Sequence, residues 1–329
     1  MLRRLGDGYR HLHQYRGIEA IAAFEKLSAL EGNTAWAYVQ IATAYFNMAQ
    51  YQQAEQAFKK ARKLEPSRIL GMELYSTVLW FLKKEHELCY LAQELVALDR
   101  HAPQTWCVLG NCFSVQREFE TAIKFFQRAI QVCPSFTYAY TLVGHEHVSN
   151  EDFEKATASF RNSLRADERH YNAWYGLAII YLKQEKYQLA EYHLRRALAI
   201  NPRNSVLYCY LGIVLLSAGA CMEALQVLQD AIDLDPANPL AKLRKAMALS
   251  HLDRNTEALE ELQQLQQLAP RESMVYMQMG KVLKKLGRLQ EALACFNHAI
   301  DLDPKGGNAV KAQIDRLQIQ DLEEDESFL

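Results

Sequence analysis

Small and bulky apolar positions alternate along this chain with a fixed period of 34 residues. Counted from Met1, nine units of 34 residues follow one another without insertion or deletion. The eighth position of every unit is small, and the twenty-fourth is bulky in eight of the nine. Small residues let two helix axes approach, and bulky ones fill the remaining space, so each unit is predicted to be a hairpin of a helix A and a helix B. The eighth positions are Gly8, Ala42, Ser76, Gly110, Gly144, Ala178, Gly212, Ala246 and Gly280.

Proline marks the end of most units. Six of the eight prolines share one position of the repeat, where proline stops helix B before the next unit begins. The third unit departs most from the pattern, because Leu88, Ala92 and Arg100 replace the expected alanine, phenylalanine and proline. We therefore expect the helix B of the third unit to be irregular. The six prolines are Pro66, Pro134, Pro202, Pro236, Pro270 and Pro304.

The repeat resembles the tetratricopeptide repeat. The sixth unit meets the pattern of that family almost in full with Trp174, Leu177, Tyr181, Ala190, Ala197 and Pro202. The resemblance implies an all-α, right-handed tetratricopeptide-repeat superhelix of nine hairpins over residues 1–306, in one unbroken solenoid. Residues 307–320 are expected to form a C-terminal capping helix, and residues 321–329 an acidic, disordered tail.

The net charge and the longest uncharged run give no indication of nucleic acid or membrane as a partner. With 37 basic and 39 acidic side chains the net charge is near zero, so no general attraction to nucleic acid or to a lipid surface is expected. One uncharged run, residues 205–222, approaches the length of a membrane span. It keeps the register of the repeat, with Leu211, Gly212 and Leu215 at helix A positions, so we interpret it as a buried helix A. No membrane partner and no secretion signal are predicted.

The sequence offers no recognisable catalytic or cofactor site. Nucleotide-binding, hydrolase and zinc-protease motifs are absent, and the seven cysteines form no CxxC pair. His145 and His147 lie two residues apart on a predicted helix and point to different sides, so they cannot chelate one metal. We therefore expect a protein that is not an enzyme, needs no cofactor or metal, and works in a reducing compartment, the nucleus and cytoplasm.

A peptide groove is the predicted working surface. In solenoids of this kind helix A lines the concave face, so its positions two, five, nine, twelve and thirteen should supply the groove, with position six on its flank. Glu73 is the acidic residue that we place there, near the aromatic Trp80 and Tyr175. A carboxylate among aromatic rings favours an arginine, whose guanidinium can pair and stack at once. The alternative, that each of these side chains only packs against the adjacent helix, stays open.

Another known groove chemistry does not fit. The clamp that holds acidic chaperone tails needs lysine at position five of a unit and asparagine at position nine. Position five here is never lysine. An acidic chaperone tail is therefore not the expected ligand.

Four stretches resemble one family more closely than the repeat requires. Residues 71–80, 105–156, 169–191 and 299–308, with GNCFS, YTLVGHE and HYNAWYGL among them, are similar to the C-terminal superhelix of the cell division cycle protein 27 family. That family is a scaffold and receptor subunit of a ubiquitin ligase, the anaphase-promoting complex. The resemblance implies partners among the other subunits of the complex, and a groove that captures the C-terminal Ile-Arg tails of coactivators and of the processivity subunit.

The same resemblance assigns roles to particular residues. The tail-binding asparagine and leucine of the family correspond to Asn111 and Leu142. Asn111 is expected to donate to the terminal carboxylate or peptide backbone, Leu142 to contact the isoleucine and Glu73 to pair with the guanidinium. The predicted peptide-binding residues are Glu73, Trp80, Asn111, Leu142, His145 and Tyr175.

Other readings remain beside this one. A generic tetratricopeptide adaptor, such as a transport or chaperone scaffold, is the main alternative, and the regulatory arm of an enzyme is a third. Members of the family add an N-terminal repeat array, which makes the homodimer, and a long disordered insert. Neither is found in this sequence, so the resemblance does not extend to homodimerisation.

Overall fold

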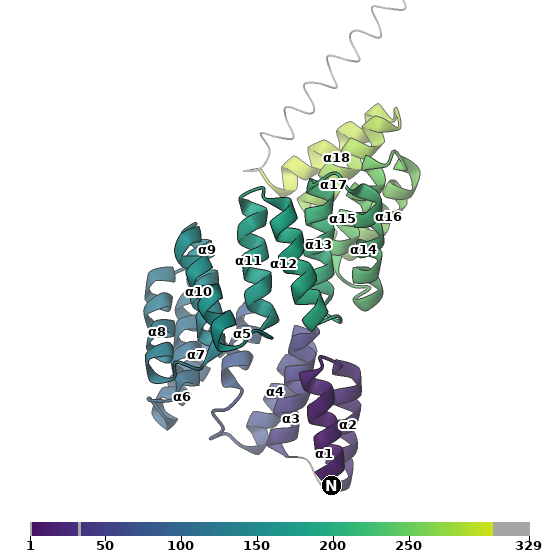
Figure 1. The fold of residues 1–329 in the computed structure, drawn as a ribbon. Helices are drawn as coiled ribbons and strands as arrows, with labels where there is room; N and C mark the ends of the chain where they lie inside the picture. The colour runs from purple at the N-terminus through teal and green to yellow at the C-terminus, as the bar shows by residue number, and fades with distance from the viewer. Residues whose placement is uncertain (1, 32–33, 305–329) are drawn as a thin grey trace, which may run out of the picture. The chain divides into compact units, whose positions relative to one another are not determined.

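The computed structural model describes residues 2–31 and 34–304, and all of its regular structure there is helical (Figure 1). Eighteen helices pair into the nine predicted hairpins. The A helices are α1 (Leu2–His13), α3 (Ala35–Asn47), α5 (Met72–Phe81), α7 (Pro103–Val115), α9 (Thr137–Ser149), α11 (Tyr171–Lys183), α13 (Ser205–Ser217), α15 (Pro239–His251) and α17 (Ser273–Lys285). The B helices are α2 (Gly17–Glu31), α4 (Tyr51–Leu64), α6 (Glu85–Leu98), α8 (Phe119–Val132), α10 (Phe153–Ala166), α12 (Tyr187–Ile200), α14 (Cys221–Leu234), α16 (Asn255–Leu268) and α18 (Leu289–Leu302).

The third unit is irregular in its helix A, not in its helix B. The prediction for α6 was wrong, because α6 has 14 residues like the other B helices that follow α2. Instead α5 begins three residues late and has only 10 residues, where α3 and α7 have 13. The cause is Gly71, which precedes α5 with φ of 90° and would bring a Cβ atom within 2.6 Å of Val39. Glycine alone tolerates both conditions.

Every turn from helix A to helix B uses a left-handed residue at the fifteenth position of the unit. Only two of these nine positions are glycine, and the other seven bear side chains at φ near 60°. This conformation costs a residue with a Cβ about 1 kcal/mol or more. Packing between helix A and helix B therefore stabilises the strained turn. The nine residues are Tyr15, Ala49, Lys83, Arg117, Glu151, Glu185, Gly219, Asp253 and Gly287.

Close contact between helix A and helix B explains the small eighth position. A Cβ atom on Gly144 would lie 2.6 Å from the ring of Phe160, and one on Gly280 would lie 2.6 Å from Phe296. Both phenylalanines are fully buried. The predicted pairing of a small residue with a bulky one is therefore confirmed in these two hairpins.

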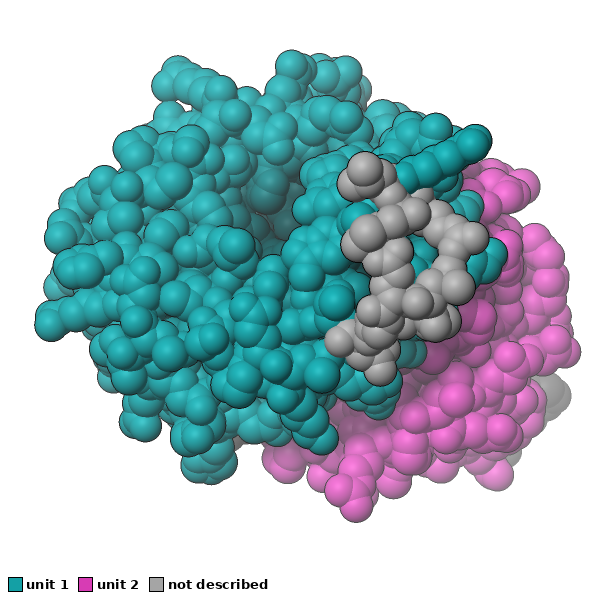
Figure 2. All heavy atoms as spheres, turned by 90° about the horizontal axis from the view of Figure 1, so that it is seen from below, with its two compact units in different colours: residues 1–207 teal, residues 208–329 magenta. Residues whose placement is uncertain are grey.

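The helices form two compact units, residues 1–207 (unit 1) and residues 208–329 (unit 2), coloured separately in Figure 2. The prediction of one unbroken solenoid over 1–306 stays a prediction, and the expected capping helix (307–320) and tail (321–329) lie outside the described residues. The apolar run from residue 205 forms α13, which has 13 residues. In the part of the chain that the structure describes, no helix is long and apolar enough to cross a membrane.

Unit 1 curves so far that its first and sixth repeats touch. Arg203 pairs with Glu19 through two bonds of 2.8 Å, although the two residues are 184 positions apart. The rings of Tyr15 and Tyr171 meet edge to face, with 5.3 Å between their centroids. Asn201 also donates to the backbone oxygen of Asn47 at 3.0 Å. These contacts fix the curvature of unit 1, because they join segments about five repeats apart.

Candidate peptide-binding site

The six predicted peptide-binding residues lie on four A helices of unit 1. Helix α5 bears Glu73 and Trp80, α7 bears Asn111, α9 bears Leu142 and His145, and α11 bears Tyr175. Figure 2 shows a recess among the atoms of unit 1. The repeat places all six on helix A, as the register predicts.

Asn111 is buried, and its amide is already bonded. Its Nδ2 donates to Ser76 Oγ at 2.8 Å and to Thr77 Oγ1 at 3.0 Å, and only 3% of the residue is exposed. The hydroxyls of Ser76 and Thr77 in turn donate to the backbone oxygen of Glu73, at 2.7 and 3.2 Å. Asn111 thus ties α7 to the second turn of α5. Donation to a peptide would require Asn111 to exchange one of these bonds, and this role stays a prediction.

Glu73 carries a desolvated carboxyl group with no basic partner. One carboxylate oxygen accepts the backbone N–H of Gly71 at 3.1 Å, and no cation lies within ion-pair distance of Glu73 among the described residues. Burial raises the pKa of Glu73 to about 7, against the smaller effect of its backbone hydrogen bonds. Its charge also raises the pKa of Cys107 and of Tyr138, after the larger effect of burial, so both groups lie near it. A guanidinium at this position would relieve the cost of ionising Glu73.

Trp80 belongs to a second polar chain that the sequence did not reveal. Its Nε1 donates to Ser114 Oγ at 3.0 Å, and Ser114 donates to Glu146 Oε1 at 2.7 Å. Glu146 is only 6% exposed, and its other oxygen, Oε2, has no hydrogen-bond partner. Burial raises the pKa of Glu146 to about 7, although its bond to Ser114 acts in the opposite direction. Lys83 Nζ lies 4.6 Å from the centroid of the Trp80 ring, so a cation already contacts that ring.

Glu146 escaped the prediction because of its position in the repeat. It is the tenth residue of its unit, outside the positions assigned to the groove. The signal in the sequence is Glu146 itself, an acidic residue between His145 and His147 on a predicted helix A. Among the described residues no group of three or more metal-binding side chains occurs.

Leu142, His145 and Tyr175 form the apolar side of the site. Leu142 is 8% exposed and belongs to a buried cluster with Cys107, while His145 and Tyr175 are partly buried. The His145 ring lies 5.1 Å from that of Phe160 and 6.3 Å from that of Tyr175. Burial, and to a lesser degree a neighbouring histidine, lowers the pKa of His145 to about 4, so the ring is neutral at physiological pH.

Tyr138 connects the polar and apolar parts. Its hydroxyl donates to Thr77 Oγ1 at 2.7 Å, and its ring lies 6.3 Å from that of His170. His170 is also the charge neighbour of His145. Contacts therefore run from α5 through α9 to α11, and the site combines an unpaired carboxyl, apolar walls and hydroxyl groups. Such a surface suits an extended peptide with one basic and one apolar side chain.

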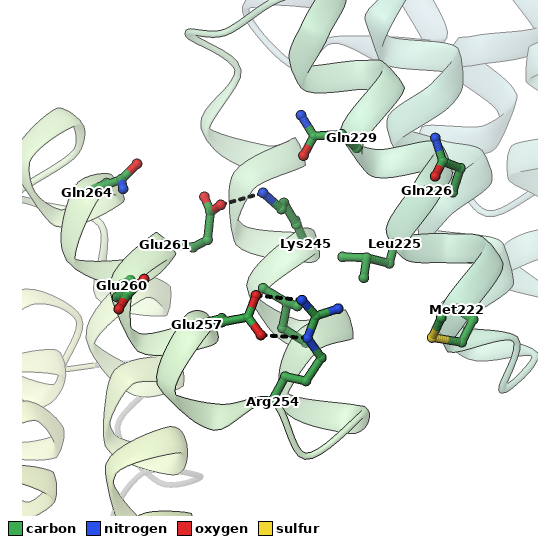
Figure 3. A pocket seen from close by; sticks show the side chains of 11 residues that line it. Met222, Leu225, Gln226, Gln229, Lys245, Arg254, Glu257, Glu260, Glu261 and Gln264 are labelled. Carbon is green, nitrogen blue, oxygen red and sulfur yellow. Dashed lines mark hydrogen bonds and ion pairs between the residues drawn. The ribbon is translucent and has the colours of Figure 1, made fainter.

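Unit 2 has a cavity of about 370 Å³, shown in Figure 3. Helices α14, α15 and α16 line it. Arg254 pairs with Glu257 at 2.7 and 2.5 Å, which holds the pKa of Glu257 below its usual value, and Lys245 pairs with Glu261. These four lining charges are paired within the protein, in contrast to the carboxyl group of Glu73.

Comparison with known proteins identifies the repeat. Models of the tetratricopeptide repeat match residues 37–68, 103–136 and 143–205, and a model of the Psidin N-terminal TPR repeats region matches residues 214–313. The solved structure of the APC/C hetero-tetramer Cut9–Hcn1 is similar in fold, with a TM-score of 0.77 over 91% of this chain and 59% of that chain, at 16% identity. The chain is a tetratricopeptide-repeat protein, and the predicted fold class is confirmed.

The curated relatives are more specific. The chain is 45% identical over 180 residues to anaphase-promoting complex subunit 3 of Schizosaccharomyces pombe, covering 55% of this chain and 27% of the relative. It is 46% identical over 180 residues to cell division cycle protein 27 homolog B of Arabidopsis thaliana (55% and 24%), and 49% identical over 135 residues to the Homo sapiens homolog (41% and 16%). The chain is a homologue of these proteins, as the resemblance indicated. The matched segment spans about a quarter or less of each.

Proposed function

We propose that this chain is a non-catalytic scaffold and receptor segment of an anaphase-promoting complex, acting in cell division in the nucleus and cytoplasm. The observation that carries the proposal is its identity of 45–49% to subunit 3 and cell division cycle protein 27 proteins. Other subunits of the complex are its proposed partners. The helical hairpins supply an extended surface for such contacts.

The proposed ligand is the C-terminal Ile-Arg tail of coactivators and of the processivity subunit. Glu73 supports this choice, because its carboxyl is desolvated and lacks a cation, and an arginine would supply one. Leu142 and the nearby rings offer contact to the isoleucine. Asn111, between α7 and α5, would bind the terminal carboxylate or peptide backbone after exchanging a bond with Thr77 or Ser76.

Fluorescence anisotropy with a labelled peptide ending in Ile-Arg tests this function. We expect binding that a scrambled peptide lacks and that amidation of the C-terminus weakens. Asn111→Ala and Leu142→Ala should each weaken it by about 1 to 3 kcal/mol. The matched controls are Asn162→Ala on α10 and Leu189→Ala on α12, two exposed positions on B helices that should leave binding unchanged.

The generic adaptor is the second candidate function. Its support is the repeat itself, which occurs over much of the chain and does not specify a partner. Equal affinity for the Ile-Arg and scrambled peptides, or indifference to both Asn111→Ala and Leu142→Ala, would favour it. Proteins that co-purify with the chain would then show whether it serves transport, a chaperone or an enzyme whose catalytic domain lies elsewhere.

A further inference from the structure

Two cysteines from successive units face each other in unit 1. Cys89 on α6 and Cys112 on α7 lie with their sulfur atoms 2.6 Å apart, and both thiols are free and partly buried. Gln116 Nε2 lies 3.7 Å from the sulfur of Cys89. Their closeness is a feature of the tertiary structure, because the two residues are 23 positions apart in the chain.

We propose that Cys89 and Cys112 form a reversible disulfide that links α6 to α7. A disulfide needs about 2.0 Å between the sulfur atoms, so a small side-chain movement closes the bond. Disulfides in reducing compartments are mostly transient and respond to oxidants, which suits a pair of free thiols in a homologue of cell-division proteins. The proposal does not depend on the peptide-binding function.

Hydrogen peroxide is the oxidant class that we assign. The thiol of Cys89 loses its proton, its thiolate attacks one peroxide oxygen, and the O–O bond breaks. Cys89 becomes a sulfenic acid, and the hydroxide that leaves takes up that proton to form water. The thiolate of Cys112 then attacks the sulfur of Cys89 and displaces hydroxide, which takes up the proton lost by the Cys112 thiol and leaves as a second water. Two thiols and one peroxide thus give one disulfide and two waters. The protein loses two electrons and two protons in all.

The surroundings of the sulfurs suggest the order of these steps. Burial raises the pKa of Cys112 to about 12, with its contact to Cys89 as a smaller cause. Cys112 is therefore seldom a thiolate and is the poorer group for meeting a peroxide from solvent. Once Cys89 is oxidised, Cys112 already lies beside it, so the second step is intramolecular. The high effective concentration of Cys112 compensates for its small thiolate fraction. Cys107, also on α7, is fully buried, so it should stay unreacted.

Peptide mapping of the full chain tests the linkage. The reduced protein is treated with hydrogen peroxide, its remaining thiols are alkylated, and it is digested with trypsin without reductant. We expect a linked pair of peptides, residues 85–100 and 101–117, with an alkyl group on Cys107 and two hydrogen atoms fewer than the same two peptides with Cys89 and Cys112 as free thiols. The second peptide contains both Cys107 and Cys112, so fragment ions between them must place the bond at Cys112.

Variants make the result decisive. Cys112→Ser and Cys89→Ser should each abolish the linked pair, whereas Cys133→Ser, a half-buried control at the end of α8, should leave it unchanged. Oxidation should also raise the melting temperature of the wild-type chain, reversibly with dithiothreitol, but not that of Cys89→Ser. Fully alkylated Cys89 and Cys112 after peroxide, or a linkage that persists in Cys112→Ser, would overturn the proposal.

Discussion

Tyr138 donates a hydrogen bond of 2.7 Å to Thr77 and so joins α9 to α5, which belong to the fifth and third 34-residue repeats. Thr77 also accepts a bond from Asn111 on α7. One hydroxyl group therefore connects three successive A helices. The site is held together by side-chain bonds between units as well as by the apolar contacts of each hairpin.

Removing this hydroxyl contact should weaken unit 1. Tyr138→Phe keeps the ring but loses the hydrogen bond. We expect the free energy of unfolding, measured in urea, to fall by about 0.5 to 1.5 kcal/mol. Tyr140→Phe is the matched control, since the hydroxyl of Tyr140 donates to the backbone oxygen of Pro134 at an exposed site. An equal loss in the two variants would show that the bond to Thr77 has no special weight.

Binding of an Ile-Arg peptide should strengthen as pH rises through about 7. Glu73 has a pKa of about 7 in the free protein, so it is largely neutral below that pH and gains its charge above it. A charged carboxylate pairs better with guanidinium. Anisotropy titrations with an N-acetylated peptide, at about one pH unit on either side of this pKa, measure the effect.

Two substitutions identify the group responsible for this pH dependence. Glu73→Gln should abolish it, whereas Glu146→Gln should leave it, although Glu146 titrates in the same range. The pKa of His145 is about 4, so that ring does not titrate there. A dependence that survives Glu73→Gln would exclude Glu73 as the partner of the arginine.

Glu146 should make the protein less stable at higher pH. Its pKa is about 7 in the folded state against 4.5 as the usual value, so the folded protein holds its proton more tightly. The stability that this proton gives is complete below about 4.5 and is lost as pH rises through about 7, by roughly 3 kcal/mol at most. Urea unfolding at several pH values measures this loss.

Glu146→Gln should remove the part of that loss that comes from Glu146 and leave the part that comes from Glu73, whose pKa is also raised to about 7. Glutamine can still accept the bond from Ser114 but has no charge to bury. The exposed Glu154 on α10 provides the control, and Glu154→Gln should leave the wild-type profile unchanged. Identical profiles for wild type and Glu146→Gln would contradict the assignment.

Two glycines should respond to alanine with opposite signs. Gly219 has φ of 83° in the turn before α14, and Gly6 lies inside α1, yet an added Cβ would meet no atom within 4 Å at either place. Gly219→Ala should therefore destabilise the fold by about 1 kcal/mol through backbone strain alone. Gly6→Ala should stabilise it by about 0.5 to 1 kcal/mol, because alanine favours the helix. Chemical denaturation of both variants would show whether the signs differ.

The sequence alone determined the helices and their pairing. A small residue such as Gly144 and a bulky one such as Phe160 recur at fixed positions, and each pair meets within one hairpin, so local spacing suffices to predict the contact. The same register placed all six candidate residues on A helices. It failed at α5, because the late start depends on how Gly71 packs against Val39 from the preceding unit.

Only the tertiary structure decided how the 34-residue repeats within unit 1 contact one another. The bonds of Asn111 to Ser76 and Thr77, the burial of Glu146 and the pairing of Arg203 with Glu19 join residues from different units. A repeat fixes what lies within one hairpin, but the direction of a polar side chain depends on what the neighbouring helices leave for it to bond. The distance between Cys89 and Cys112 has the same origin, since it follows from the packing of one unit on the next.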